Sequence, residues 1–268
     1  MPFVEVDGVI HHCVVEGRSK GPTLVFSNSL GSDLRIWDRV IPYFVNHFTV
    51  IRYDKRGHGL SDVPAAPYVI DDYVRDLAGL LDKLGVNDAV ICGLSIGGMI
   101  AQAFAAAHPD RVRALVLCDT GMTIGTPALW DERIATVRSG GLSRLVAPSM
   151  ERWFTQTFRD QQTVQVRGYA NMLLRTSVEG YIGACCAIRG ADLSGTTPSI
   201  RKPTLVLCGD QDIATPPDLG QALARAIPGG KFHLIKDAAH LVCIEQPDLL
   251  ARIVMQFFKE KGIAQQSI

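Results

Sequence analysis

The sequence predicts an α/β domain in which a mostly parallel central sheet is flanked by helices. Two patterns predict this fold class: near-continuous apolar runs of strand length recur along the chain, and amphipathic helical patterns lie between many of them. The third observation is size, because 268 residues with 47% hydrophobic and 20% charged residues can bury one large core. Such alternation is typical of parallel strands joined by right-handed crossovers.

The strand-like runs have the apolar, β-branched composition of strands that are buried on both faces of a sheet. They span residues 23–28, 48–54, 88–93, 114–119, 204–209 and 231–237. Helical patterns span residues 70–85, 96–109, 217–228 and 247–262.

One interval interrupts this alternation. Between residues 125 and 198, amphipathic helical patterns continue without a convincing buried strand, and the strand pattern resumes at Thr204. We therefore expect a helical cap at 125–198, folded over the sheet, between a first part of the core at 1–124 and a second part at 199–268.

Charge and cysteine content exclude several classes of partner. Lys plus Arg and Asp plus Glu both number 27, so the chain has no net basic field that would attract nucleic acid or an anionic membrane. We find no secretion-signal pattern and no apolar run of membrane-spanning length. The seven cysteines are scattered and form no CxxC pair or metal-ligand spacing. We expect a reduced, cytoplasmic protein without a metal site, whose oligomeric state stays open.

Ser95 lies where the predicted strand 88–93 meets the predicted helix 96–109, within the pentapeptide GLSIG. The pattern G-x-S-x-G is typical of a sharp turn that exposes a serine hydroxyl above a sheet. Ligands of open α/β sheets bind beyond the carboxyl ends of the strands, where this serine lies. A serine that only caps the helix is the alternative. The strand, turn and helix together favour a nucleophile.

A nucleophilic serine needs a base that takes its proton. His240 is the best candidate because it follows the last predicted strand, in a loop before the final helix. In contrast, His233 lies inside a strand and His108 closes a helix. The chain order of serine, acid and histidine supports His240.

A carboxylate must then orient the base. The segment after the strand 204–209 offers Asp210 and Asp212, and Asp119 at the end of the strand 114–119 is a third candidate. The spacing favours Asp212, although aspartates beside Gly and Pro are often only turn residues.

Four motifs across essentially the whole chain resemble the α/β-hydrolase superfamily: GLSIGG, YDKRGHGLSD at 53–62, GDQDIATP at 209–216 and the AAH that ends at His240. The resemblance implies an α/β-hydrolase fold with a helical cap inserted after the sixth strand. It places the acid of the pattern G-x-x-D-x-x-x-P on Asp212 and leaves Asp210 as a turn residue. It also implies that the turn containing His58 is architectural.

The chain departs from the superfamily after its third strand. Many members have His-Gly there, whereas this chain has Asn28 and Ser29 in FSNSLG. The resemblance assigns the oxyanion-hole donors to the backbone N–H groups of Leu30 and Ile96. Alternatively, the side chains of Asn28 and Ser29 only tie the loop together.

The motifs FSNSLG-x-D-x-x-x-W, YDKRGHGLSD and CGLSIGGMI are similar to those of the 3-oxoadipate enol-lactonases of the β-ketoadipate pathway. This resemblance implies cofactor-free hydrolysis of a small, carboxylated enol-lactone to 3-oxoadipate through an acyl-enzyme. A carboxylesterase or a cofactor-free perhydrolase on the same scaffold is the first alternative. A small-molecule receptor without turnover is the second, and the intact set of catalytic residue types argues against it.

A substrate carboxylate calls for a cation near the site, and the cap segment WDERIATVR supplies two. Arg133 and Arg138 flank an apolar helical stripe that includes Trp130. We favour Arg133 because it lies one turn from Trp130, although helical spacing barely separates the two arginines. A solvated surface arginine is the alternative. Trp153 is a second candidate wall of the pocket, unless it is only core.

Overall fold

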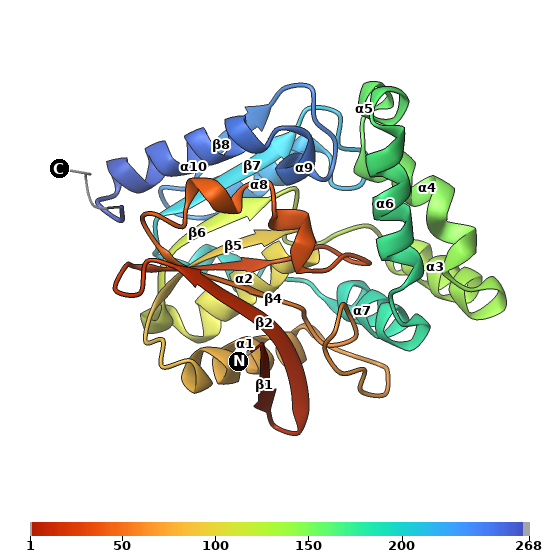
Figure 1. Cartoon of the computed structure of the whole chain (residues 1–268), viewed down its shortest axis with the longest axis horizontal. Coiled ribbons are helices and arrows are strands. Elements are labelled where there is room, and N and C mark those ends of the chain that lie inside the picture. Colours follow the sequence, from red (N-terminus) through yellow and green to blue (C-terminus); the bar gives the residue numbers. More distant parts are fainter. Residues whose placement is uncertain (1, 265–268) are drawn as a thin grey trace.

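Eight strands form one sheet in the order β1-β2-β4-β3-β5-β6-β7-β8 (Figure 1) in the computed structural model, which describes residues 2–264. The pairs β1–β2 and β2–β4 are antiparallel, and all other neighbours are parallel. The strands are β1 (Phe3–Val6), β2 (Val9–Gly17), β3 (Thr23–Ser27), β4 (Thr49–Tyr53), β5 (Ala89–Leu94), β6 (Val112–Cys118), β7 (Thr204–Gly209) and β8 (Lys231–Ile235).

Four helices of the core begin close to the predicted positions: α1 (Ile70–Lys83), α2 (Ile96–Ala107), α8 (Pro217–Ala226) and α10 (Pro247–Glu260). The short helix α9 (Val242–Glu245) lies where the sequence interpretation expects a loop. A proline at the first position starts α8 and α10, where its missing N–H costs nothing and its fixed φ suits a helix. Phe258 of α10 packs on Phe48, with ring centroids 5.1 Å apart, and so joins the last helix to the core.

The central strands β5 and β7 are buried at every position, as their continuous apolar runs predict. The sequence interpretation is wrong for β8, whose residues alternate between exposed and half-buried before the buried Ile235, because the strand lies at an edge of the sheet. It also omits β1, which lies at the other edge, and β2 beside it, neither of which has a continuous apolar run. Strands at or next to an edge of the sheet can expose one face to solvent, so they lack the continuous apolar run that marks a strand buried on both faces.

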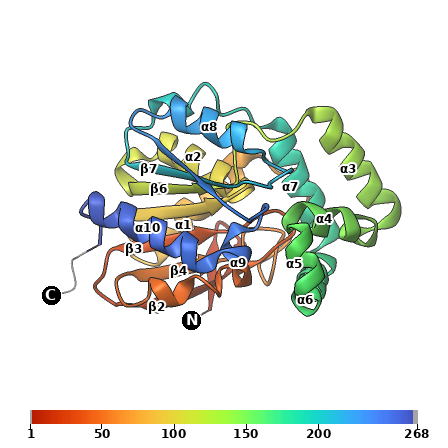
Figure 2. The ribbon, with the colours of Figure 1, turned by 90° about the horizontal axis from the view of Figure 1, so that it is seen from above.

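Five α-helices and no strand lie between β6 and β7, in the interval where the sequence predicts a helical cap. They are α3 (Pro127–Gly140), α4 (Val146–Trp153), α5 (Gln156–Gln161), α6 (Thr163–Leu174) and α7 (Val178–Gly190). They gather at one side of the molecule (Figures 1 and 2). The boundaries at 125 and 198 stay predictions. Within the described residues, no helix combines the length and the apolar character that crossing a bilayer requires.

Two glycines bring α7 against the turn that follows β4. A Cβ atom on Gly180 would lie 2.2 Å from the carbonyl oxygen of Gly57, closer than real Cβ contacts allow. The backbones of the cap and of the core therefore touch directly here.

This contact predicts different effects for two glycines of α7. We expect Gly180→Ala to lower the free energy of unfolding by about 2 kcal/mol, because the added methyl group collides with backbone. Gly190→Ala is the matched control, since nothing lies within 4 Å of its Cβ position, and it should change stability by less than about 1 kcal/mol. Denaturant unfolding measures both, and equal effects would contradict this packing.

Candidate active site

Ser95 adopts a backbone conformation that residues other than glycine rarely adopt, with φ 58° and ψ −119°. It directly precedes α2, at the carboxyl end of β5. Its N–H donates to the carbonyl of Cys118 at 3.0 Å, and its own carbonyl accepts the hydroxyl of Thr120 at 2.7 Å. The end of β6 and the loop that follows it therefore hold the strained turn through both backbone groups of the serine.

Glycines on either side of Ser95 make the turn sterically possible. A Cβ atom on Gly93 would lie 2.2 Å from the carbonyl oxygen of Gly97, and one on Gly97 would lie 2.2 Å from the carbonyl oxygen of Ser27. Any larger residue would push α2 away from β5 or from the end of β3. The sharp turn and the close approach of helix to sheet thus have the same steric cause.

His240 and Asp212 meet above the carboxyl ends of the sheet, from loops after β8 and β7. The Nδ1 atom of His240 lies 2.9 Å from Oδ2 of Asp212. Thr215 donates its hydroxyl to the same Asp212 oxygen at 2.6 Å, and its Oγ1 lies 3.2 Å from Nδ1 of His240. The other oxygen of Asp212 accepts the N–H groups of Ala214 and Thr215 at 2.7 and 3.1 Å.

The surroundings of Asp212 keep it ionised. Burial acts to raise the pKa of its carboxyl, but the charge of His240 and the hydrogen bonds from His240 and Thr215 outweigh burial and lower it. An ionised carboxylate holds the proton of His240 on Nδ1 and leaves Nε2 free to accept one. Thr215 was not singled out from the sequence, although a threonine three residues after an aspartate is a recognisable turn pattern.

The other two candidate acids do not contact His240. Asp210 lies beside Lys236, with 3.4 Å between its Oδ2 and the ammonium nitrogen. Asp119 accepts the N–H of Gly209 at 2.9 Å, and burial together with the charge of Asp212 raises its pKa well above the usual range. Both effects oppose ionisation of Asp119, and its carboxyl forms no hydrogen bond with His240, which contacts Asp212 instead.

Asp119, Cys208 and Asp212 bring potential metal-ligand atoms within 4.8 Å of one another. Burial raises the pKa of the Cys208 thiol as well as that of Asp119. Metal ions bind the deprotonated forms of these groups, and the Asp212 carboxylate already accepts four hydrogen bonds. The cluster is a poor donor set for a metal ion.

Ser95 and His240 line a single cavity of about 110 Å³ together with Ser29 and Leu30. The Nε2 atom of His240 lies 3.5 Å from the hydroxyl of Ser29. In the described part of the chain, residues 2–264, the hydroxyl of Ser95 forms no hydrogen bond with His240. Catalytic hydrogen bonds are often long before substrate binds. Two hydroxyls therefore compete for the role of nucleophile, and only that of Ser95 stands on a strained turn.

The N–H groups of Leu30 and Ile96 have no hydrogen-bond acceptor in the described part of the chain. Both residues are buried, and Ile96 directly follows Ser95 at the start of α2. Unpaired N–H groups beside a nucleophile are suited to hold a developing negative charge.

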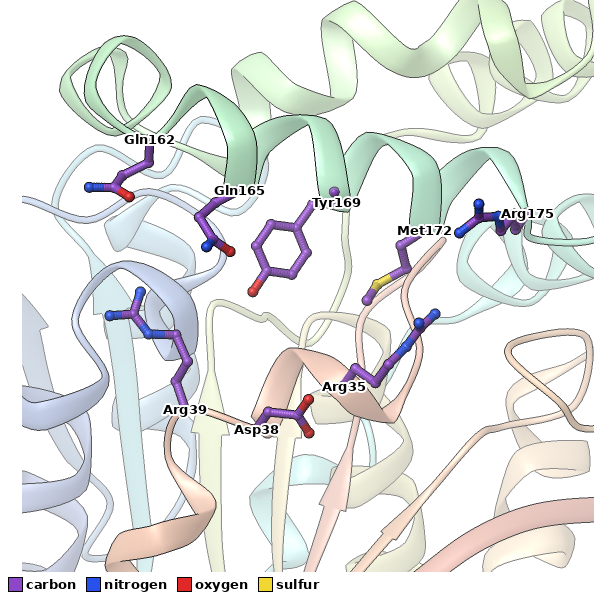
Figure 3. A pocket seen from close by; sticks show the side chains of 9 residues that line it. Arg35, Asp38, Arg39, Gln162, Gln165, Tyr169, Met172 and Arg175 are labelled. Atoms are coloured by element: carbon purple, nitrogen blue, oxygen red, sulfur yellow. The ribbon is translucent and has the colours of Figure 1, made fainter.

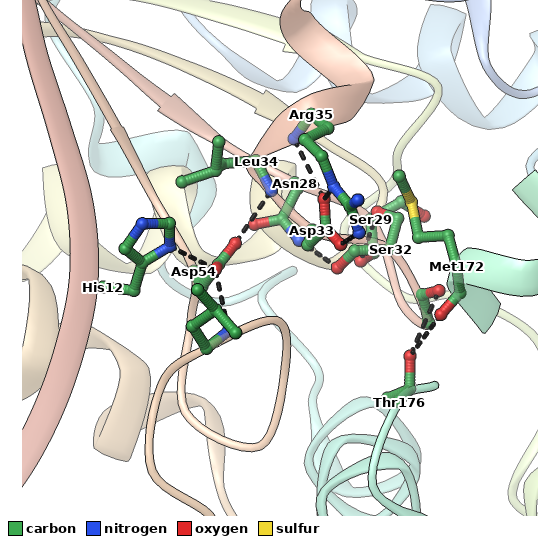
Figure 4. A network of polar contacts seen from close by, with 12 residues as sticks. His12, Asn28, Ser29, Ser32, Asp33, Leu34, Arg35, Asp54, Met172 and Thr176 are labelled. Carbon is green, nitrogen blue, oxygen red and sulfur yellow. Dashed lines mark hydrogen bonds and ion pairs between the residues drawn. The ribbon is translucent and has the colours of Figure 1, made fainter. Parts of the chain in front are cut away.

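A polar network holds the loop that carries Leu30 (Figure 4). The side chain of Asn28 donates to the carbonyl of Ser32, so Asn28 ties the loop together as one of the two alternatives proposes. Asp54 accepts the N–H of Leu34 at 2.8 Å and contacts Nδ1 of His12 at 2.8 Å. The turn after β4 and the loop after β3 are thus joined through buried hydrogen bonds.

His58 has a structural place in this network. Its Nε2 atom accepts the N–H of Gly31 at 3.0 Å. Burial, and then the charge of Lys55, lower the pKa of His58 well below the usual range, so the ring stays neutral and can accept this bond.

The cap supplies the outer wall of the cavity. Trp130, Arg133 and Trp153 all line it, whereas Arg138 lines a different surface pocket beside Arg189. Arg133 donates from Nε to the hydroxyl of Tyr181 at 2.8 Å, which fixes the guanidinium without neutralising it. The structure therefore separates the two arginines that helical spacing left equivalent.

Arg152 of α4 also lines this cavity, and the sequence interpretation missed it. Neither Arg152 nor Arg133 forms an ion pair within the part of the chain that the structure describes. Burial, and then the charge of Arg133, lower the pKa of Arg152. In the sequence, the only sign that Arg152 lines the cavity is its position next to Trp153, which was a candidate wall of the pocket.

A larger and more open cleft of about 580 Å³ lies between α6 and the short helix η1 (Leu34–Trp37) (Figure 3). Its walls include Arg35, Arg39 and Tyr169, but neither Ser95 nor His240. Arg35 is already paired with Asp33 at 2.5 Å. The smaller cavity, which contains the hydroxyls and the imidazole, is the candidate active site.

The model of the alpha/beta hydrolase fold family matches residues 22–247. The chain belongs to this family, and the fold class predicted from its sequence is confirmed.

The resemblance to enol-lactonases is also confirmed. The chain is 35% identical over 243 residues to 3-oxoadipate enol-lactonase 2 of Acinetobacter baylyi, with 91% of each chain covered. It is 32% identical over 245 residues to 3-oxoadipate enol-lactonase 1 of the same organism, again with 91% of each covered. The enol-lactonase structure from Burkholderia xenovorans LB400 superposes with a TM-score of 0.94 at 37% identity, covering 96% of this chain and 100% of that one. These relatives support the predicted class of enzyme, a carboxylic-ester hydrolase.

The hydroxyl of Thr215 should matter for turnover, because it donates to the carboxylate that orients His240. We expect Thr215→Val to lower kcat about tenfold, the effect of losing one hydrogen bond to a charged group. Thr215→Ser keeps the hydroxyl and should stay close to the parent. Steady-state hydrolysis of p-nitrophenyl acetate provides the comparison, and equal losses in both variants would contradict this role.

Proposed function

We propose that this protein opens the lactone ring of 3-oxoadipate enol-lactone, giving 3-oxoadipate in aromatic catabolism, through a triad of Ser95, His240 and Asp212. The observation that carries the substrate class is the pair of guanidinium groups of Arg133 and Arg152 in the cavity wall, which lack carboxylate partners among the described residues. A carboxylate on the substrate would neutralise them through charge-assisted hydrogen bonds. The likeness to enol-lactonases supports the same substrate class.

The size and lining of the cavity support a small substrate. About 110 Å³ is enclosed by the apolar side chains of Leu129, Trp130 and Trp153 on the cap side and by polar groups on the sheet side. An apolar wall with a few directed polar groups suits a flat ring that carries one charge. The ring would lie against the tryptophans, with its carboxylate at the arginines and its carbonyl over Ser95.

In the first half of the reaction, Oγ of Ser95 attacks the lactone carbonyl as Nε2 of His240 takes the hydroxyl proton. Asp212 stabilises the imidazolium that forms. The N–H groups of Leu30 and Ile96 hold the oxyanion of the tetrahedral intermediate, a contribution of about 3 kcal/mol per donor.

Collapse of this intermediate breaks the ring C–O bond, and the enol oxygen leaves with the proton held by His240. The released enol converts to its ketone, and because an enol is a good leaving group, His240 has less to supply than in amide hydrolysis. In the second half, water gives a proton to His240 and attacks the acyl-enzyme. His240 returns this proton to Oγ of Ser95 as the acyl bond breaks. The new carboxylic acid releases its proton to solvent, so the product carries two carboxylates.

The nucleophile can be identified by comparing the two hydroxyls near His240. We expect Ser95→Ala to lower kcat by about 10⁴-fold or more while the protein stays folded. Ser29→Ala should lower kcat less than about tenfold, because Ser29 only contacts the imidazole edge at 3.5 Å. Single-turnover and steady-state hydrolysis of the enol-lactone measure both, and the reverse order would transfer the nucleophile to Ser29.

The two cavity arginines should act on the charged substrate alone. We expect Arg133→Met and Arg152→Met each to raise KM for the carboxylated lactone about tenfold or more, while KM for neutral p-nitrophenyl acetate changes little. Arg138→Met is the matched control, since Arg138 lines another pocket.

Two outcomes would replace this proposal. Equal effects on both substrates would place the anion site elsewhere, and efficient turnover of the neutral ester without turnover of the lactone would indicate a general carboxylesterase. Binding of the lactone without multiple turnovers would indicate a receptor.

A further inference from the structure

Lys55 is completely buried, and the mechanism above does not use it. It lies in the turn after β4, and its Nζ atom donates to the carbonyl oxygen of Ser29 at 2.7 Å. Lysines are almost never fully buried unless their ammonium group is paired, because removing a charge from water is costly. A buried lysine aimed at one backbone carbonyl therefore calls for a reason.

The carbonyl of Ser29 and the N–H of Leu30 belong to the same peptide group, whose resonance couples the two ends. A positive charge at the oxygen draws electron density away from the nitrogen and makes the N–H a stronger donor. We propose that Lys55 is a positioning residue that polarises the Ser29–Leu30 peptide and so strengthens the Leu30 amide toward the oxyanion. This inference rests on the proposed function, which places the oxyanion at that amide.

The neighbouring contacts hold this peptide in a single orientation. The hydroxyl of Ser32 donates to the same Ser29 carbonyl at 3.0 Å and supplies a neutral second donor. The next amide, that of Gly31, is tied down by Nε2 of His58 at 3.0 Å. While the carbonyl end of this peptide is held by two donors, its N–H end, on Leu30, has no acceptor within residues 2–264. Leu30 also lines the cavity.

The charged groups around Lys55 decide how the effect depends on pH. Burial lowers the pKa of Lys55 to about 7, and the carboxylates of Asp54 and Asp33 act in the opposite direction. His58 also faces it and is kept neutral by burial and by the lysine charge. The ammonium form is therefore present at pH 6 and is lost as the pH rises through about 7.

The polarisation should appear in kcat rather than in KM, because the oxyanion exists only after Ser95 attacks. We expect Lys55→Met to lower kcat about tenfold at pH 6. The ratio of parent to variant kcat should fall toward one between pH 6 and pH 9, since the parent loses its ammonium charge over that range.

Two control variants separate the charge from simple loop support. Ser32→Ala removes the neutral donor to the same carbonyl and should give a smaller loss whose ratio does not change with pH. Lys83→Met removes an exposed lysine at the end of α1 and should leave kcat unchanged. A ratio for Lys55→Met that is constant from pH 6 to pH 9 would overturn the proposal.

A spectroscopic measurement tests the same inference in the unaltered protein, even if Lys55→Met fails to fold. In protein labelled with ¹⁵N-leucine, the Leu30 amide signal, identified by its loss in Leu30→Met, should shift with a midpoint near pH 7. An amide signal that does not move between pH 6 and pH 9 would overturn the proposal. Because this shift needs no turnover, it also distinguishes failure of this inference from failure of the proposed function. If the lactone is not the substrate, the kcat ratio of parent to Lys55→Met can be measured with p-nitrophenyl acetate, whose hydrolysis also forms an oxyanion.

Discussion

The site depends on one close approach between backbones, that of Gly97 at the start of α2 to Ser27 at the end of β3. A Cβ atom on Gly97 would lie 2.2 Å from the carbonyl oxygen of Ser27 and 3.1 Å from that of Asn28, so no side chain can separate the helix from the loop. This contact brings the start of α2, where Ile96 follows Ser95, against the loop after β3 that carries Leu30. The strained conformation of Ser95 is the cost of this arrangement, and hydrogen bonds to β6 offset it.

The electrostatics of the cavity follow from how each buried charge is satisfied. Asp212 accepts four hydrogen bonds and the pKa of its carboxyl is lowered, whereas burial and the charge of Asp212 raise the pKa of nearby Asp119. Two carboxyl groups in one region thus have different roles because their surroundings differ. On the cap side, Arg133 and Arg152 are held without a carboxylate partner within the described residues, and such unpaired cations favour an anionic ligand.

Much of the fold was predictable because its strongest signals are local. β3, β5, β6 and β7 are buried on both faces and therefore appear as continuous apolar runs, and the elbow at Ser95 combines such a run with the glycines of a tight turn. The strands β1 and β2 were missed, and β8 was wrongly expected to be buried on both faces, because strands at or next to an edge of the sheet expose much of their surface and lack a continuous apolar run. Arg152, Thr215 and Lys55 were missed for a related reason, since their residue types are ordinary and only their contacts make them notable.

The sequence by itself determined the fold class, the position of the turn at Ser95, and the short set of aspartates, histidines and arginines from which a site can be built. These follow from periodicity and turn chemistry, which act between residues close together in the chain. Tertiary structure decided which members of that set meet. His240 contacts Asp212, which is 28 residues away in the sequence, and approaches Ser29, which is 211 residues away. Arg133 rather than Arg138 lines the cavity. These contacts depend on how loops from different strands converge at one edge of the sheet. No local sequence pattern specifies which residues of distant loops come close together in space.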